Sequence, residues 1–402
     1  MSRPGGATPW TGGVLAALMG LAALSAFLWP LGFTLFVPLA GLLCLPLMRP
    51  GRPEPALLAL SALTGLAMIA ATWSPVPFGL GGAASYDELE RQTWAKLPLQ
   101  LALYLPVVIA AGRLSPRATG RAARVFAWAA VALAAVLLLE ALSGARAYQA
   151  LREAIGDPIR PDLARKNVAQ ATYALALMYW PAALWLRRQH WRVPLALLTA
   201  GAWLSPVLLS AMAPAAALAL SGLALLLARA APRRGALVLG GGMAAAVLLA
   251  PWLLLLLQGP LEGLRPAVGA SWAARIDLWL ATAGEIAARP WLGWGLDASR
   301  TFDFMLLHPH SAPLQLWLEL GAAGALLAAG FWFLLLRRAG RDGEADPGGA
   351  GQAAATAVVY FVVGALSFGV WQEWWLALGA LAATWAALAA RAPDPADETI
   401  EA

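Results

Sequence analysis

The chain has 402 residues, of which 60% are hydrophobic and only 12% are charged, and its formal net charge is +6. Soluble domains usually carry about 25% charged residues, so this composition excludes an ordinary soluble protein and indicates an integral membrane protein. The excess of basic groups is then a topology signal and no sign of nucleic-acid binding. With Cys44 as its one cysteine, the chain can form neither an internal disulfide nor a cysteine-based zinc finger.

Twelve apolar runs are long enough, or nearly so, to cross a hydrocarbon core of about 30 Å. They lie near residues 11–29, 31–48, 54–73, 97–112, 122–142, 168–186, 193–209, 212–228, 235–257, 310–336, 353–370 and 373–390. We therefore expect an all-α polytopic membrane protein with about twelve transmembrane helices, nine in residues 1–257 and three in residues 310–390. The first run is expected to be retained as a span, and residues 391–402 to form a disordered cytoplasmic tail.

The distribution of lysine and arginine predicts the orientation of these spans. With the N-terminus in the cytoplasm, most of the 28 basic residues fall in inside segments, and the C-terminus is also cytoplasmic. Many of the 20 tryptophans, Trp371 among them, lie near run ends, as interfacial anchors do. The polar chemistry is then confined to three outside segments, near residues 74–96, 143–167 and 258–309.

The longest outside segment, residues 258–309, contains a second kind of helix. Within residues 271–288 the apolar side chains recur at helical spacing, which predicts an amphipathic helix lying in the outer interface. This stripe consists of Trp272, Ile276, Trp279, Leu280, Ala283 and Ile286. Pro290 is expected to end the helix, and Gly293-Trp-Gly295 to form a tight turn.

Two of the three histidines, His308 and His310, stand directly before the tenth apolar run. Arginines in the neighbouring outside segments disfavour the imidazolium form, so we expect a neutral His310 imidazole that can accept a proton. A general base near neutral pH requires such a group. His308 is the weaker candidate, because Pro309 separates the two and only one can begin the helix.

Several outside cations are candidates for binding a phosphate group. The segment Arg165-Lys-Asn167 abuts the sixth run at headgroup depth, where arginine can hold a phosphate bidentately; ordinary lipid headgroups are an equally good ligand there. Arg265 and Arg275 flank or lie on the amphipathic helix and can face a pyrophosphate. The full set of cationic candidates is Arg160, Arg165, Lys166, Arg265, Arg275 and Arg300.

The acidic and amide groups give weaker signals. Asp87-Glu-Leu-Glu90 is a possible but poorly supported metal site, and we expect no metal or cofactor. Gln315 and Glu319 are four residues apart on one helix face, and Glu319 is expected to pack or hydrogen-bond inside the bundle. The spacing Gly321-Ala-Ala-Gly324 predicts close helix packing.

At these residues the chain resembles a known family. His310-Ser311, nine residues and Gly321-Ala-Ala-Gly324 are similar to the H-[NSQ]-x9-G-x-x-G signature of bacterial O-antigen ligases. Arg275-Ile-Asp-Leu-Trp279 and Arg289-Pro-Trp-Leu-Gly-Trp-Gly295 resemble the R-x3-W and P-x-x-G-x-G patterns of the wider ligase and polymerase superfamily. Relatives often carry an S-R-G triplet where this chain has Ser210-Ala-Met-Ala213, so no arginine is available at that place.

The resemblance implies a glycosyltransferase in the bacterial inner membrane with its active site facing the periplasm. The donor would be a polysaccharide on undecaprenyl pyrophosphate, and the acceptor a sugar hydroxyl of lipid A–core. His310 would act as the base, and arginines would bind the pyrophosphate in place of a metal.

Two other functions remain open on the sequence. An O-antigen polymerase would use the same cations and base to join two lipid-linked repeats. A transporter of lipid-linked polysaccharide would form no glycosidic bond. The chain has no P-loop, and its spans carry few charged groups, which weighs against an ATP-driven pump and against a transporter. Protein O-oligosaccharyl transfer is weaker still.

Overall fold

The computed structural model describes residues 9–45, 54–76 and 92–393. Across these three stretches the secondary structure is helical and contains no strand. The major helices are α1 (Pro9–Leu28), α2 (Phe33–Cys44), α3 (Pro55–Ala70), α5 (Thr93–Ala111), α6 (Pro116–Ser143), α8 (Pro161–Arg188), α9 (Arg192–Leu208), α10 (Met212–Ala230), α11 (Pro232–Leu256), α14 (Ala312–Asp342), α15 (Pro347–Leu366) and α16 (Glu373–Arg391). Shorter or peripheral helices are α7 (Arg146–Ala154), α12 (Gln258–Leu264) and α13 (Ala270–Ala288).

Each of the twelve predicted apolar runs coincides with one of the major helices. Within the described residues, nine helices are long and apolar enough to cross a membrane. The other three are α2 and α9, which are shorter, and α8, which carries charged residues in its first and last turns. These observations support an all-α polytopic membrane protein, while the count of twelve spans stays a prediction.

The helix boundaries follow from local chemistry. Helices α3, α6, α8, α11, α14 and α15 have proline at the first or second helical position, where the N–H that proline lacks would have no partner within the helix. Helix α6 is the best capped: Ser115 accepts a hydrogen bond from the Ala118 amide, and Gly144 ends the helix in the left-handed conformation. Helix α8 begins at Pro161, so Arg165 and Lys166 lie on a helix and not in the preceding loop.

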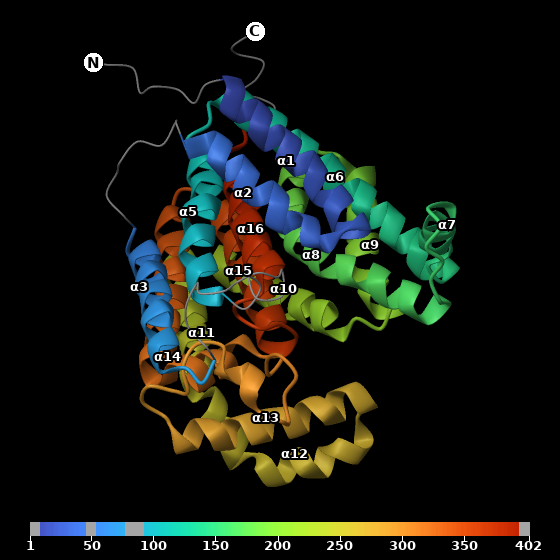
Figure 1. Ribbon diagram of the computed structural model, residues 1–402. Helices are drawn as coiled ribbons and strands as arrows, with labels where there is room; N and C mark the ends of the chain where they lie inside the picture. Colours follow the sequence, from blue (N-terminus) through green and yellow to red (C-terminus); the bar gives the residue numbers. More distant parts are fainter. Residues whose placement is uncertain (1–8, 46–53, 77–91, 394–402) are drawn as a thin grey trace, which may run out of the picture.

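The long helices form one bundle, and α13 lies across one end of it, with α12 beside it (Figure 1). Helix α1 begins and α16 ends at the opposite end of the bundle. One hydrophobic core joins α1, α6, α8 and α16, and a second joins α3, α11 and α14 to α13. The bundle therefore separates the termini of the described chain from the segment that holds the two histidines.

Helix α13 matches the amphipathic helix predicted over residues 271–288. Ile276, Ala283 and Ile286 of the predicted stripe are buried, and Trp279 is partly buried against the second core. Its placement in a membrane interface stays a prediction.

Candidate functional site at the start of helix α14

Helix α14 is broken at Gly321, and the loop that precedes the helix pairs with the break. Gly321 has φ 62° and ψ −157°, so the helical hydrogen-bond pattern is interrupted there. The carbonyl of Leu318 accepts from the Trp294 amide at 2.8 Å, and the carbonyl of Glu319 accepts from the Gly295 amide at 2.9 Å. The Ala322 amide donates to the Pro290 carbonyl at 2.8 Å. Backbone groups freed by a break inside a bundle must find such partners, so the loop and the break stabilise each other.

Three glycines allow this pairing because their neighbours leave no room for a side chain. A Cβ at Gly321 would lie 2.3 Å from the Trp291 carbonyl oxygen, and one at Gly293 would lie 2.6 Å from the Glu319 carbonyl carbon. All three glycines, including Gly295, have positive φ. The prediction that Gly321 serves close helix packing is therefore wrong: Gly321 serves a backbone break. Close helix approach occurs elsewhere, for example at Gly201, where a Cβ would lie 2.4 Å from the Ala134 carbonyl oxygen.

Glu319 and Gln315 tie three segments together one turn before the break. The Glu319 side chain is fully buried and accepts hydrogen bonds from the Asp297 amide at 3.0 Å, from Gln315 Nε2 at 3.0 Å and from Trp371 Nε1 at 2.6 Å. Gln315 Oε1 accepts from the Val370 amide at 2.8 Å. Trp371 is thus an internal hydrogen-bond donor, which its assignment as an interfacial anchor did not foresee.

Asp297 is a buried acidic residue in the same region that the sequence interpretation passed over. It is 4% exposed, has φ 62° and pairs with Arg300, whose Nε lies 3.3 Å from its carboxylate. Burial raises the pKa of the Asp297 carboxyl, while Arg300, Thr93 and Lys96 act against that rise. Lys96 also pairs with Glu373 at 2.5 Å, which links the start of α5 to the start of α16.

His310 is held in a defined orientation at the entry to α14. Its φ is 52°, an uncommon value for a residue with a side chain. Its Nδ1 lies 3.0 Å from the Ser367 carbonyl oxygen in the turn between α15 and α16. Because a carbonyl oxygen can only accept, Nδ1 carries the proton, and in the neutral ring the lone pair is on Nε2. His310 is an exposed residue.

His308 supports His310 and is itself poorly suited to take a proton. Its Nδ1 accepts a hydrogen bond from the His310 amide at 3.1 Å, and the two ring centroids are 4.6 Å apart. Burial lowers the pKa of His308 to about 4, with His310 and Arg300 adding to the effect. A neutral His308 ring can accept the hydrogen bond from the His310 amide, whereas an imidazolium cannot.

Helix α13 and the loop before His308 both bind the backbone of this histidine segment. Trp279 Nε1 donates to the Pro309 carbonyl at 2.9 Å, and Ser299 Oγ donates to the Leu307 carbonyl at 2.8 Å. The site is therefore assembled from α13, the 289–311 loop, α14 and the turn before α16. Asp297, Ser299, Ser367 and Trp279 were not predicted as site residues. The sequence signals for them were the place of Trp279 in the apolar stripe and in the R-x3-W pattern, and the position of Asp297 and Ser299 just after the Gly293-Trp-Gly295 turn.

The two candidate arginines on and before α13 differ in their surroundings. Arg275 lies over the Trp272 ring at 4.9 Å, and Trp272 in turn packs edge-on against Trp279 with centroids 6.3 Å apart. Arg275 is therefore on the helix face that reaches Pro309. Arg265 instead pairs with Asp277 at 2.6 Å, and both of these side chains are about half exposed.

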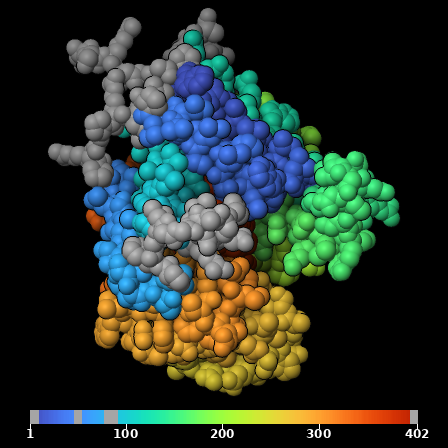
Figure 2. Space-filling model, in the orientation of Figure 1, coloured from blue at the N-terminus to red at the C-terminus, as the bar shows by residue number. Residues whose placement is uncertain are grey.

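The candidate cations Arg160, Arg165 and Lys166 lie at or near the start of α8. Arg165 donates to the Leu208 carbonyl at 3.3 Å, and Arg160 pairs with Asp162 at 2.6 Å. Two turns along α8 from Lys166, Tyr173 packs against Phe368 with ring centroids 4.8 Å apart, and Phe368 follows the carbonyl that holds His310. Figure 2 shows a recess between the green segment, which contains α7 and the start of α8, and the gold segment of α12 and α13.

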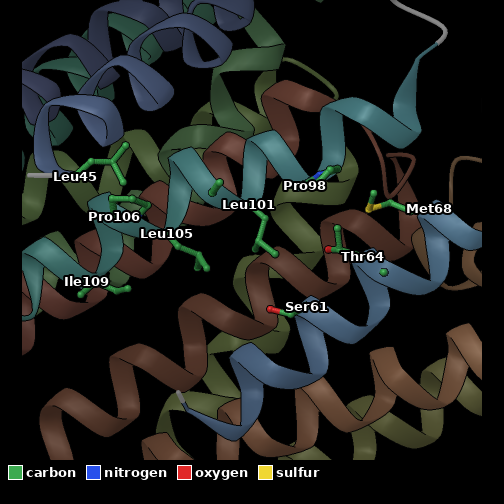
Figure 3. A pocket seen from close by; sticks show the side chains of 11 residues that line it. Leu45, Ser61, Thr64, Met68, Pro98, Leu101, Leu105, Pro106 and Ile109 are labelled. Carbon is green, nitrogen blue, oxygen red and sulfur yellow. The ribbon is translucent and has the colours of Figure 1, made fainter. Parts of the chain in front are cut away.

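An apolar groove approaches the site from the side of the bundle. It lies between α3 and α5, has a volume of about 500 Å³ and is lined by side chains such as Thr64, Met68 and Leu101 (Figure 3). The end of α3, which lies beside the groove, and Ser74 just after it bind the 289–311 loop (the site loop). The Leu296 amide donates to the Ala70 carbonyl at 3.4 Å, and Ser74 Oγ donates to the Leu296 carbonyl at 2.6 Å.

The possible metal site of the sequence analysis is the acidic segment 87–90. Asp87, Glu88 and Glu90 lie outside the described residues. Within the part of the chain that is described, no group of three His, Cys, Asp or Glu side chains is arranged to hold a metal ion.

Comparison with curated proteins finds distant relatives of one kind. A Rickettsia bellii (strain RML369-C) protein named "Putative polysaccharide ligase" is 29% identical over 120 residues, which are 26% of this chain and 29% of that protein. A Rickettsia felis protein with the same name is 26% identical over 122 residues, or 27% of this chain and 30% of that protein. The chain is distantly similar to proteins that carry the name "Putative polysaccharide ligase".

This polysaccharide-ligase similarity covers less than a third of either relative's length. No protein-family profile matches the chain, and no solved structure matches it.

Proposed function

We propose that the protein is a membrane glycosyltransferase that moves a polysaccharide from undecaprenyl pyrophosphate to a sugar hydroxyl of lipid A–core, at the periplasmic face of the inner membrane. The observation that carries this proposal is His310, whose Nδ1–H is fixed on the Ser367 carbonyl so that Nε2 can accept a proton. The names of the distant relatives support the polysaccharide part of the proposal.

The reaction needs one proton transfer and one bond exchange. The acceptor hydroxyl gives its proton to His310 Nε2 as its oxygen attacks the anomeric carbon of the donor sugar. The bond from that carbon to the pyrophosphate oxygen breaks, and the electron pair leaves with undecaprenyl pyrophosphate. The new glycosidic bond joins the polysaccharide to lipid A–core.

The leaving pyrophosphate gains charge during this step, and fixed cations stabilise it. Arg275 has the best claim, because it shares a helix face with Trp279, which binds the histidine loop. Lys166 and Arg165 on α8 can contact the same group across the recess, and Arg300 lies beside His308. Arg265, Arg160 and Arg300 are already paired with carboxylates, so we assign them a smaller role. In this proposal the cations take the role of a metal ion.

The α3–α5 groove fits the lipid part of the donor. Its lining is mostly apolar, and its neighbouring helix ends bind Leu296, one residue before Asp297. A polyprenyl chain in the groove would leave its pyrophosphate near the site loop.

The test uses purified protein, a lipid-pyrophosphate glycan and lipid A–core, with and without a chelator. A glycan-bearing lipid A band that survives chelation is the expected result. Loss of the band in chelator would contradict the metal-independent mechanism and direct attention to Asp87, Glu88 and Glu90. Longer glycan on the carrier, without the band, would mean a polymerase. Neither product from folded protein would favour a transporter.

A further inference from the structure

A second cavity lies at the other end of the bundle, far from His308 and His310 along the helices. It has a volume of about 580 Å³ and is formed by α8, α9, α10 and α15. Its walls combine basic and apolar side chains, among them Arg187, Arg229, Trp180 and Leu225. It is at the end where α16 finishes, because Arg188 Nη1 of the same wall donates to the Ala389 carbonyl at 3.0 Å.

The charge balance of this cavity favours an anion. Among the described residues Asp346 is a nearby carboxylate, and Arg188 pairs with it at 2.8 Å. Arg187 and Arg229 are both exposed cavity residues, and within the described residues no carboxylate pairs with either of them. The positive end of α15 adds to their charge, since the helix starts at Pro347 and Gly348 lines the cavity.

A buried amide supplies an independent sign of a ligand. Gln352 lines the cavity and is 1% exposed. Its Nε2 donates to the Ala386 carbonyl at 2.9 Å, but its buried Oε1 has no hydrogen-bond partner in the described structure. A buried acceptor left unpaired is costly, so a ligand that brings a donor there, such as a hydroxyl, would be favoured.

We infer that this cavity binds an anionic phospholipid whose headgroup joins a phosphate diester to a hydroxyl, as in phosphatidylglycerol. Arg187 and Arg229 bind the phosphate oxygens. The headgroup hydroxyl donates to Gln352 Oε1. Trp180, Leu184 and Leu225 lie against the start of an acyl chain. The site is separate from the proposed transfer reaction and does not depend on it.

The binding test uses delipidated protein in detergent and native mass spectrometry with three lipids. Phosphatidylglycerol should bind most tightly, phosphatidylmethanol, which has the same charge and no hydroxyl, about threefold to tenfold more weakly, and phosphatidylcholine much more weakly. Glycerol 3-phosphate should not compete at equal concentration. If it competed as well as the lipid, the ligand would be a free phosphate ester and the inference would be overturned.

Two sets of variants test the assigned contacts. The double variant Arg187→Gln with Arg229→Gln should lose at least tenfold in phosphatidylglycerol affinity, while Arg234→Gln, an exposed arginine at the same end but outside the cavity, should not. Gln352→Leu should make phosphatidylglycerol and phosphatidylmethanol bind equally. Unchanged affinity in the double variant, or an unchanged preference in Gln352→Leu, would overturn the site. Melting temperatures without lipid show that each variant is folded.

Discussion

At the scale of single residues, His308 and His310 differ in their surroundings and in their hydrogen bonds. His310 has its Nδ1 fixed by a carbonyl and an exposed ring, as a base requires, whereas His308 is partly buried and accepts a backbone hydrogen bond. Their identity as a pair could be read from the sequence, and so could the choice of His310. Which ring nitrogen of His310 is hydrogen-bonded could not be predicted, because its partner Ser367 lies 57 residues further along the chain.

The His308 environment predicts a pH dependence of stability. The pKa of His308 is about 4 in the folded protein against a usual 6.5, so the unfolded chain binds a proton first as the pH falls. Stability should therefore be full above pH 6.5, fall between 6.5 and about 4, and level off below that. Thermal unfolding of wild type and His308→Asn over this range measures it. Equal pH slopes for the two proteins would contradict the assignment.

Arg275 provides the second residue-scale prediction. Arg275→Gln should lower the transfer rate by about 10², because a fixed cation at the leaving group is lost. Arg146→Gln is the matched control, since Arg146 is an exposed arginine on α7. The ratio of transfer rates in one membrane preparation measures the effect. Equal rates for both variants would remove Arg275 from the pyrophosphate site.

At the scale of elements, the site depends on a helix that stops and restarts. The apolar pattern of residues 310–336 predicts one continuous helix, and nothing in its periodicity shows the break at Gly321. The break is visible only with the 289–295 loop in place, because the loop amides pair with the carbonyls of Leu318 and Glu319. The length of the α13 helix and its buried stripe, in contrast, were predictable, since they follow from helical spacing alone.

Gly321→Ala tests the break directly. The substitution forces a Cβ to within 2.3 Å of the Trp291 carbonyl oxygen at a positive φ, and should cost roughly 1–3 kcal/mol of stability. Gly330→Ala on the same helix has open space around the new methyl group and should be neutral or slightly stabilising. Melting temperatures in detergent give the comparison. A Gly321→Ala protein as stable as Gly330→Ala would mean that α14 is unbroken.

At the scale of the whole molecule, the length of the bundle separates the histidine site from the basic cavity. The histidine site lies at the end crossed by α13, and the basic cavity of Arg187 and Arg229 lies at the other. Hydropathy predicted the runs that become the major helices, because each of these helices is apolar along most of its length. It could not predict that α8 extends back to Pro161, since the first turns of that helix are polar.

The orientation of the bundle can be tested with single cysteines. The native Cys44 is buried, so we expect little background labelling from it. Ser271→Cys at the start of α13 should react with an impermeant thiol reagent in intact spheroplasts, whereas His190→Cys in the turn after α8 should react only after lysis. Both positions are exposed, so accessibility to the reagent depends on the side of the membrane. The reverse pattern would invert the proposed topology.

The role of His310 is tested by comparing three proteins in proteoliposomes with a labelled lipid-pyrophosphate glycan and lipid A–core: wild type, His310→Ala and His190→Ala. His190 is an exposed histidine that also has positive φ, at the opposite end of the bundle, and is therefore a matched control. We expect His190→Ala to transfer glycan at the wild-type rate and His310→Ala to lose about 10² or more, with melting temperatures unchanged. Full transfer by folded His310→Ala would contradict the central claim that His310 is the base.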